Sequence, residues 1–295
     1  MDAVEQLRDK VISDLFKTAT FNKAWEAWFP KISATLGSEF KNANILKLGE
    51  SLSEIFKSTS DGRDQSQVSG GGAAWEALVC WYLNLCLIGS KTVIVKSKKA
   101  NIPNCVRETI SVIYNGNFKS NTESDLLAIT FPEHECLKSK FTTHKMLLEK
   151  MNEVIESSFK ETELTIIQCK TNWNDNAQIP MLWDLIYSSN GFSQNVHVGA
   201  GPFSPKLLKK FTYAFVTVPT SRGSFEPNST PVMRVRNLSG GNYWGKKTKS
   251  GVANSVFDII QRNFKNSFDN YPNGWHLDIS ALIKAKRSNG NPFSL

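Results

Sequence analysis

The sequence predicts an α/β protein in which helices flank a mixed central β-sheet and a helical region precedes that sheet. Three observations support this fold class. Hydrophobic residues make up 40% and charged residues 21% of the 295 residues, which is typical of a folded globular protein. The first ~60 residues carry apolar side chains at helical spacing. After residue 73, apolar runs of strand length alternate with amphipathic segments of helical length.

The N-terminal region is expected to be helical. Val4, Leu7 and Val11 recur at the spacing that places side chains on one face of a helix. An aromatic face continues this pattern as far as Pro30, where we expect the helix to end because proline interrupts helical hydrogen bonding. A second amphipathic helix is expected over 45–56.

The central region contains the elements of the expected sheet. A polar linker over 57–72 leads into an almost wholly apolar helix over 73–88. Strands are expected over 92–95, 106–114, 125–131, 164–170 and 211–218, with a turn at Asn115–Gly116 and helices over 142–159 and 179–187. Short strands and helices are expected to alternate in the tail, over 232–235, 255–264 and 277–283. The chain thus divides into a helical N-terminal region (1–68), a sheet-containing core (69–220) and C-terminal elements packed on that core (221–295).

The cysteines and histidines do not form the patterns of a metal site. The five cysteines are an odd number without CxxC spacing, and most lie in apolar stretches where a reduced thiol behaves as a small hydrophobe. The four histidines show no HxxxH spacing. This usage favours a reducing cytoplasm and argues against zinc. No secretory signal is recognisable, and the apolar run over 73–88 is shorter than the roughly 20 residues that span a bilayer, so no membrane association is expected.

The net charge of +8 is concentrated in one segment. Residues 204–251 contain nine basic residues and one acid, Glu226, so this segment accounts for the whole excess. A further basic run extends from Lys91 to Arg107 without an acid. Concentrated positive charge on an otherwise neutral chain indicates a polyanion-binding surface, although a solvated basic face without a partner has the same pattern.

Four polar residues lie in elements that otherwise have core composition. Asp125 opens an apolar strand, Gln168 and Lys170 are two apart in another and therefore share a face of the sheet, and Glu76 is the one charge on the apolar helix. An unpaired charge costs several kcal/mol to bury, so these groups need each other, a solvent-exposed cleft or a metal.

This pattern resembles the PD-(D/E)xK nuclease superfamily over roughly residues 70–220. In that family a helix precedes a small mixed sheet, one strand supplies an acid, and a second strand supplies (D/E)xK or, in some members, QxK. Here Ser124-Asp125 and Gln168-Cys169-Lys170 take these places, and Glu76 matches the acid that many members carry on the preceding helix. The chain departs from the pattern because no proline precedes Asp125, the spacing holds an additional helix, and glutamine replaces the middle acid.

The resemblance implies a restriction-endonuclease-like core over 69–220 and an Mg²⁺-dependent hydrolysis of phosphodiester bonds. It implies that Asp125 is the principal metal ligand, that Glu76 and Gln168 complete the ligand set, and that Lys170 activates the attacking water or stabilises the transition state. With two carboxylates rather than three, one tightly held metal ion is expected. Cys169 points to the opposite face from its neighbours and is expected in the core.

The resemblance also implies double-stranded DNA as the partner, with the C-terminal elements taking part in its recognition. Lysines that suit phosphate contacts are Lys206, Lys209, Lys210, Lys246, Lys247 and Lys249. Arginines that suit contacts with guanine are Arg222, Arg234 and Arg236. A bacterial, cytoplasmic type II restriction endonuclease acting as a homodimer is the function that this set of residues favours, since a two-fold dimer cuts both strands of a symmetric site.

Other interpretations of the same residues remain open. Asp125 is also suited to cap a turn, and Gln168 to be a hydrogen-bonded core amide. Lys170 can extend from a strand end into solvent, and Glu76 suits the first turn of a helix, where the helix dipole favours acids. At the level of function, the alternatives are a repair, nicking or modification-dependent nuclease with the same core, and a DNA-binding protein without catalytic activity.

Overall fold

The computed structural model describes residues 2–59, 71–97, 99–121, 124–171, 196–218, 241–243, 255–268, 275 and 279–295. Three N-terminal helices come first: α1 (Asp2–Phe16), α2 (Ala19–Leu36) and α3 (Asn42–Lys57). The expected helical N-terminal region is therefore confirmed. The expected end at Pro30 is wrong, because Pro30 lies inside α2. Trp28, Ile32 and Leu36 of this helix are all buried, and their packing outweighs the ~3 kcal/mol that an internal proline costs a helix.

The main sheet has five strands in the order β1-β4-β5-β7-β8. Helix α4 (Gly71–Cys86) precedes it in sequence. The strands are β1 (Thr92–Lys96), β4 (Leu126–Thr130), β5 (Glu163–Lys170), β7 (Lys210–Thr217) and β8 (Gly241–Tyr243). β1, β4 and β5 pair antiparallel, whereas β5 pairs with β7, and β7 with β8, in parallel. The mixed sheet expected from the sequence is thus present, and each of its first four strands lies within two residues of its expected bounds.

A second, smaller sheet has the order β3-β2-β6. It consists of β2 (Ser111–Tyr114), β3 (Phe118–Asn121) and β6 (Val196–Val198). The expected turn is confirmed, because Asn115 and Gly116 both have positive φ, at 50° and 77°. The strand expected over 106–114 is only half correct, since helix α5 (Asn104–Thr109) takes up its first part. Pro103 precedes this helix, and Cys105 and Thr109 are buried one helical turn apart, so helical burial outweighs the β-propensity of Val106.

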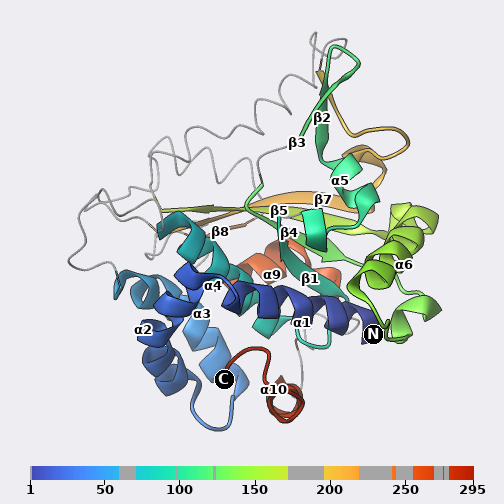
Figure 1. Ribbon diagram of the computed structural model, residues 1–295. Coiled ribbons are helices and arrows are strands. Elements are labelled where there is room, and N and C mark those ends of the chain that lie inside the picture. The colour runs from blue at the N-terminus through green and yellow to red at the C-terminus, as the bar shows by residue number, and fades with distance from the viewer. Residues whose placement is uncertain are drawn as a thin grey trace.

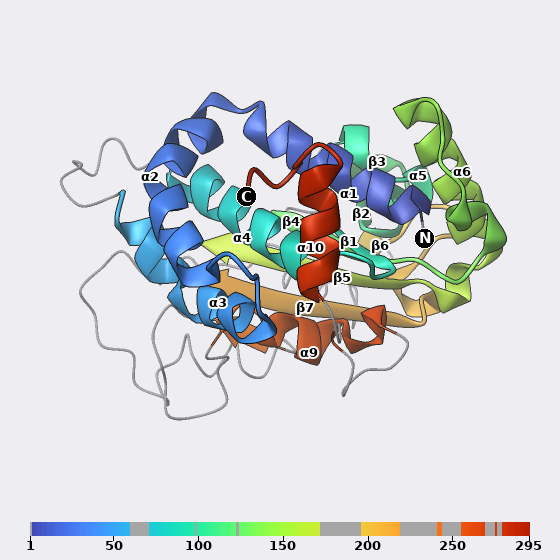
Figure 2. The ribbon, with the colours of Figure 1, turned by 90° about the horizontal axis from the view of Figure 1, so that it is seen from below.

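Helices cover one side of the main sheet and the small sheet rises from the other (Figure 1). Seen from the helical side, α1, α4 and α10 (Ile279–Ser288) lie across the strands (Figure 2). The remaining helices are α6 (His144–Ser157) and α9 (Asp258–Asn263), with short 3-10 turns at Lys99–Asn101, Glu135–Lys138, Phe159–Glu161, Pro205–Leu207 and Lys265–Ser267. One hydrophobic core includes residues from Ala3 to Phe293. In the described part of the chain, no helix has the length and apolar character needed to cross a bilayer.

Asn84 attaches α4 to the sheet through the backbone of β1. β1 is the edge strand, so Ile94 directs its N–H and C=O away from β4. The buried Asn84 amide donates to Ile94 O at 2.8 Å and accepts from Ile94 N at 3.1 Å. These two bonds take the place of a neighbouring strand and satisfy backbone groups that would otherwise be buried without a partner.

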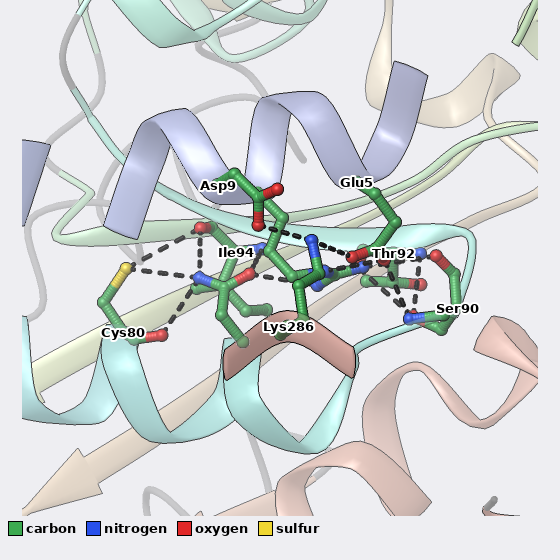
Figure 3. A network of polar contacts seen from close by, with 10 residues as sticks. Glu5, Asp9, Cys80, Ser90, Thr92, Ile94 and Lys286 are labelled. Atoms are coloured by element: carbon green, nitrogen blue, oxygen red, sulfur yellow. Dashed lines mark hydrogen bonds and ion pairs between the residues drawn. The ribbon is translucent and has the colours of Figure 1, made fainter. Parts of the chain in front are cut away.

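A buried arginine extends this contact to both ends of the chain. Figure 3 shows the polar network, with Glu5, Ser90 and Lys286 among its labelled residues. Arg8 of α1 donates to Asn84 Oδ1 at 3.1 Å and to Ser90 O at 3.2 Å. Its Nε lies 3.0 Å from Glu5 Oε1, and Lys286 of α10 lies 2.9 Å from Glu5 Oε2. The network therefore joins α1, α4, β1 and α10, and its paired charges compensate the burial of the guanidinium.

Replacing Asn84 with leucine is expected to destabilise the fold by about 3 kcal/mol, because Ile94 loses both partners and Arg8 loses one. Urea unfolding measures the change. Asn22→Leu, on the exposed face of α2, is the control and should lie within about 0.5 kcal/mol of the unsubstituted protein. Equal stability of the two variants would contradict the role given to Asn84.

The Glu5 carboxylate should make stability depend on pH. Burial by itself raises the pKa of Glu5, but the charges of Arg8 and Lys286 outweigh it and hold the pKa below its ordinary value. A depressed pKa in the folded state stabilises the protein above the unfolded pKa of about 4.3, and this stabilisation is lost as the pH falls through the folded value. The stability difference between the unsubstituted protein and Glu5→Gln should therefore be largest near neutral pH and shrink below about pH 4. Glu54→Gln, at an exposed position of α3, is the matched control.

Candidate active site

Asp125 and Lys170 meet where β4 begins and β5 ends. The antiparallel register pairs Leu126 with Ile167, so Asp125, one residue earlier, comes beside Gln168. Asp125 Oδ2 accepts a hydrogen bond from the backbone N–H of Cys169 at 2.7 Å. The same oxygen lies 3.7 Å from Lys170 Nζ. Asp125 and Lys170, 45 positions apart in sequence, thus form an ion pair at one end of these two inner strands.

Glu76 and Lys96 form a second ion pair at the same end of the strands. Glu76, Cys80 and Asn84 are spaced by four residues and form one stripe along α4. Asn84 and Cys80 both bond to the backbone of Ile94, and Glu76, one turn further, lies 3.0 Å from Lys96 Nζ at the end of β1. The contact of Asn84 with β1 therefore also determines where Glu76 lies.

The two ion pairs are neighbours. Lys96 pairs in register with Leu126, and the N–H of Ser97 donates to Asp125 O at 3.3 Å. Burial raises the pKa of the Cys169 thiol well above its ordinary value, the negative charges of Asp125 and then Glu76 raise it further, and Lys170 acts in the opposite direction. Both carboxylates thus contribute to the raised pKa of one buried thiol, and the expectation that Cys169 belongs to the core is confirmed.

The site carries two carboxylates and two ammonium groups, all partly exposed to solvent. Its formal charge is therefore zero. An arrangement of this kind can exchange partners at low cost, because each ammonium group can leave its carboxylate for a phosphate while the carboxylate binds a cation. It is chemically suited to a divalent ion and a phosphodiester bound together.

The two carboxylates of the site offer oxygen atoms, the kind of ligand that Mg²⁺ prefers. Within the described ranges, no three His, Cys, Asp or Glu side chains are grouped so that they could hold a metal ion. Mg²⁺ needs only one or two carboxylates when substrate phosphate and water supply the other ligands, so Asp125 and Glu76 are sufficient in number. Gln168 is only 2% exposed and has interactions of its own within the fold.

Lys96 is the member of the site that the sequence did not single out. In the sequence Lys96 is one of several positive charges in the basic run from Lys91 to Arg107. The available signal was its position directly after the buried residues Val93, Ile94 and Val95, which resembles that of Lys170 at the end of β5. Its pairing with Glu76 was not readable, since α4 and β1 come together only in the tertiary structure.

Of the basic residues assigned to DNA contact, the three that the structure describes lie away from this end of the strands. β5 and β7 are parallel and pair Glu163 with Lys210, so Lys206, Lys209 and Lys210 lie at the opposite end of the strands, roughly 23 Å away along β5. Lys210 donates to Asn263 O at 2.6 Å, and burial lowers its pKa. The other assigned residues, which lie outside the described residues, are Arg222, Arg234, Arg236, Lys246, Lys247 and Lys249.

No family model, curated protein or solved structure matches the chain. The resemblance to PD-(D/E)xK nucleases therefore stays a prediction from Glu76, Asp125, Gln168 and Lys170. The class that the structure defines is an α/β protein with N-terminal helices, a mixed sheet with flanking helices, and a small second sheet.

The burial of Cys169 can be tested by thiol labelling. Cys136 is partly exposed, whereas the other four cysteines are buried, and burial raises the pKa of Cys80 to about 12. With Ellman's reagent near neutral pH, we expect one fast-reacting thiol, which the Cys136→Ser variant lacks. Fast labelling of Cys169, identified by peptide mass, would contradict the closed packing between α4 and β5.

Proposed function

We propose that this chain is an Mg²⁺-dependent endonuclease that hydrolyses phosphodiester bonds in double-stranded DNA. The observation that carries the proposal is the pairing of Asp125 with Lys170 where β4 begins and β5 ends, with the Glu76–Lys96 pair beside it. Backbone hydrogen bonds and the apolar core hold the sheet together, and Asp125 adds a hydrogen bond from the Cys169 N–H. Charged groups gathered at the ends of strands are the kind of arrangement that binding and catalysis require.

The element order supports a restriction-endonuclease-like core. Helix α4 precedes the sheet, β4 begins after an acid, and β5 ends in Gln168-Cys169-Lys170. This order agrees with the arrangement that the resemblance implies. A type II restriction enzyme that acts as a homodimer is the form that we favour, because two copies of one site cut the two strands of a symmetric sequence.

Asp125 would be the principal ligand of the metal, and Glu76 the second. Bound there, Mg²⁺ would neutralise charge on the scissile phosphate and lower the pKa of a bound water. Lys170, which contacts Asp125, would orient the attacking water and offset the negative charge that develops on phosphorus. Lys96 would leave Glu76 for a phosphate oxygen as the carboxylate takes up the cation. Gln168, as a neutral amide, would position water or Asp125 without adding charge.

The first test is the loss of cleavage in Asp125→Asn and Lys170→Met. Each should lower the rate of plasmid cleavage by roughly 10²-fold or more, because each removes a group that acts on the reacting atoms. DNA binding, measured with Ca²⁺ in place of Mg²⁺, should persist. Lys209→Met, at the opposite end of the strands, is the control and should cut at the unsubstituted rate. Discrete fragments indicate sequence specificity, and nicked circles or a need for methylated DNA indicate another nuclease of this core. A protein that binds DNA without cutting it contradicts the proposal.

The second test separates the role of Lys96 from that of a structural ion pair. Lys96→Met should strengthen Mn²⁺ binding by the DNA-free protein roughly threefold to tenfold, since a competing positive charge beside Glu76 is removed. The same variant should cut more slowly, because a phosphate contact is lost. Lys91→Met is the matched control, because Lys91 precedes the same strand and pairs with Glu133 at 3.3 Å. Calorimetric titration would contradict this role if Lys96→Met bound Mn²⁺ more weakly than the control.

A further inference from the structure

The two carboxylates of the candidate site are held by different strands. Glu76 follows the position of β1, because α4 is bonded to the backbone of that strand and because Glu76 lies 3.0 Å from Lys96 Nζ. Asp125 follows β4 and β5, because its carboxylate accepts the N–H of Cys169 at 2.7 Å. The way β1 lies against β4 at this end of the sheet therefore determines the separation of the two carboxylates.

Two serines join β1 to β4 at this end. The ladder between the two strands ends with the pairing of Lys96 and Leu126. One residue further, the N–H of Ser97 donates to Asp125 O at 3.3 Å, and the hydroxyls of Ser97 and Ser124 are hydrogen-bonded to one another. Ser97 directly follows Lys96, and Ser124 directly precedes Asp125. The hydroxyl pair thus connects the neighbours of two members of the site.

Burial does not account for this hydroxyl pair. The Ser97 side chain is exposed and that of Ser124 is partly exposed, so water is available to both hydroxyls as a hydrogen-bond partner. The same two strands share a second hydroxyl pair at their other end, where Thr92 Oγ1 and Thr130 Oγ1 lie 2.8 Å apart. Both threonines are buried, and their pairing satisfies groups that water does not reach. The serine pair needs another reason, and its place beside both ion pairs supplies one.

We propose that Ser97 and Ser124 are positioning residues of the candidate metal site. Their hydrogen bond holds the end of β1 beside the start of β4, and this fixes the separation of the Glu76 and Asp125 carboxylates. Mg²⁺ demands near-ideal octahedral geometry, so two carboxylates bind it well only when their separation is held. Without the hydroxyl bond, binding of the cation includes the cost of ordering the two chain segments. This inference rests on the proposed function, since it takes the two carboxylates as ligands of a divalent ion.

The experiment compares Ser97→Ala and Ser124→Ala with the control Thr130→Val in calorimetric titrations of the DNA-free protein with Mn²⁺. Thr130→Val removes a hydroxyl bond between the same two strands, four residues and roughly 13 Å along β4 from Leu126. Each serine variant should bind Mn²⁺ about threefold to tenfold more weakly, the effect of losing one hydrogen bond, and should keep the melting temperature. Thr130→Val should lower the melting temperature and leave the Mn²⁺ affinity unchanged. Ser124→Thr, which keeps a hydroxyl, should restore the affinity.

The double variant Ser97→Ala/Ser124→Ala tests whether the two hydroxyls act through one bond. Because either single substitution already breaks that bond, the double variant should lose no more Mn²⁺ affinity than a single one. In plasmid cleavage, the Mg²⁺ concentration that gives half the maximal rate should rise by the same factor as the Mn²⁺ dissociation constant, while the rate at saturating Mg²⁺ stays the same. Losses of affinity that add would mean that each hydroxyl acts by itself, and the positioning role would be wrong.

The outcomes separate this inference from the proposed nuclease activity. If the protein cuts DNA and the serine variants bind Mn²⁺ with unchanged affinity, the positioning role is wrong and the nuclease proposal stands. If the serine variants weaken Mn²⁺ binding but the unsubstituted protein never cuts DNA, the nuclease proposal is wrong and the positioning role stands. If the unsubstituted protein binds no Mn²⁺, the positioning role is wrong whether or not the protein cuts DNA.

Two further outcomes would overturn the positioning role. Equal weakening of Mn²⁺ binding by Thr130→Val would mean that any loosening of β1 against β4 has this effect. Serine variants that bind DNA more weakly but Mn²⁺ with unchanged affinity would show that the hydroxyls contact phosphate and do not position the carboxylates.

Discussion

The contact between the Asn84 amide and the backbone of Ile94 is the constraint on which the rest of the structure depends. It replaces a missing neighbouring strand at the sheet edge, so helix and sheet are joined by directional bonds as well as by apolar packing. Arg8 shares the same amide oxygen, and through Glu5 it reaches Lys286 near the other end of the chain. The elements that cover the sheet are thereby held in one arrangement.

This constraint also places charge at the candidate site. Because α4 is fixed along β1, the stripe that contains Asn84 continues to Glu76 and brings its carboxylate to Lys96. The neighbouring Asp125–Lys170 pair depends on strand register alone, since a one-residue slip of β4 against β5 would turn Asp125 to the other face. Four charges from four elements are thus assembled by helix packing and strand pairing, and their sum is zero. The paired charges compensate one another within the fold, and in the proposed function they exchange these partners for a cation and a phosphate.

The small sheet is joined to this core without interrupting the strand pairing of the main sheet. Its strands lie in the connections between β1 and β4 and between β5 and β7. Its base is buried, whereas Phe118 near its tip is exposed. Positive charge accompanies it along the chain from Lys96 to Lys119. By contrast, Lys210 belongs to a basic run that looked equally suited to DNA, yet it is bonded to Asn263 at the far end of the sheet. Basic composition is a local property, and which edge of the sheet it reaches depends on strand direction.

The sequence by itself determined the helices and strands with strong periodicity, the mixed sheet, and the unusual position of Glu76, Asp125, Gln168 and Lys170 among core residues. These follow from local spacing and from the cost of burying charge, both of which are visible along the chain. Only the tertiary structure decided that α2 continues through Pro30, that residues 104–109 are helical, that Lys96 is the partner of Glu76, and that Lys206, Lys209 and Lys210 lie away from Asp125. Each of these depends on contacts between residues far apart in sequence. The energy of such contacts outweighs local propensity, and no local sequence pattern predicts them.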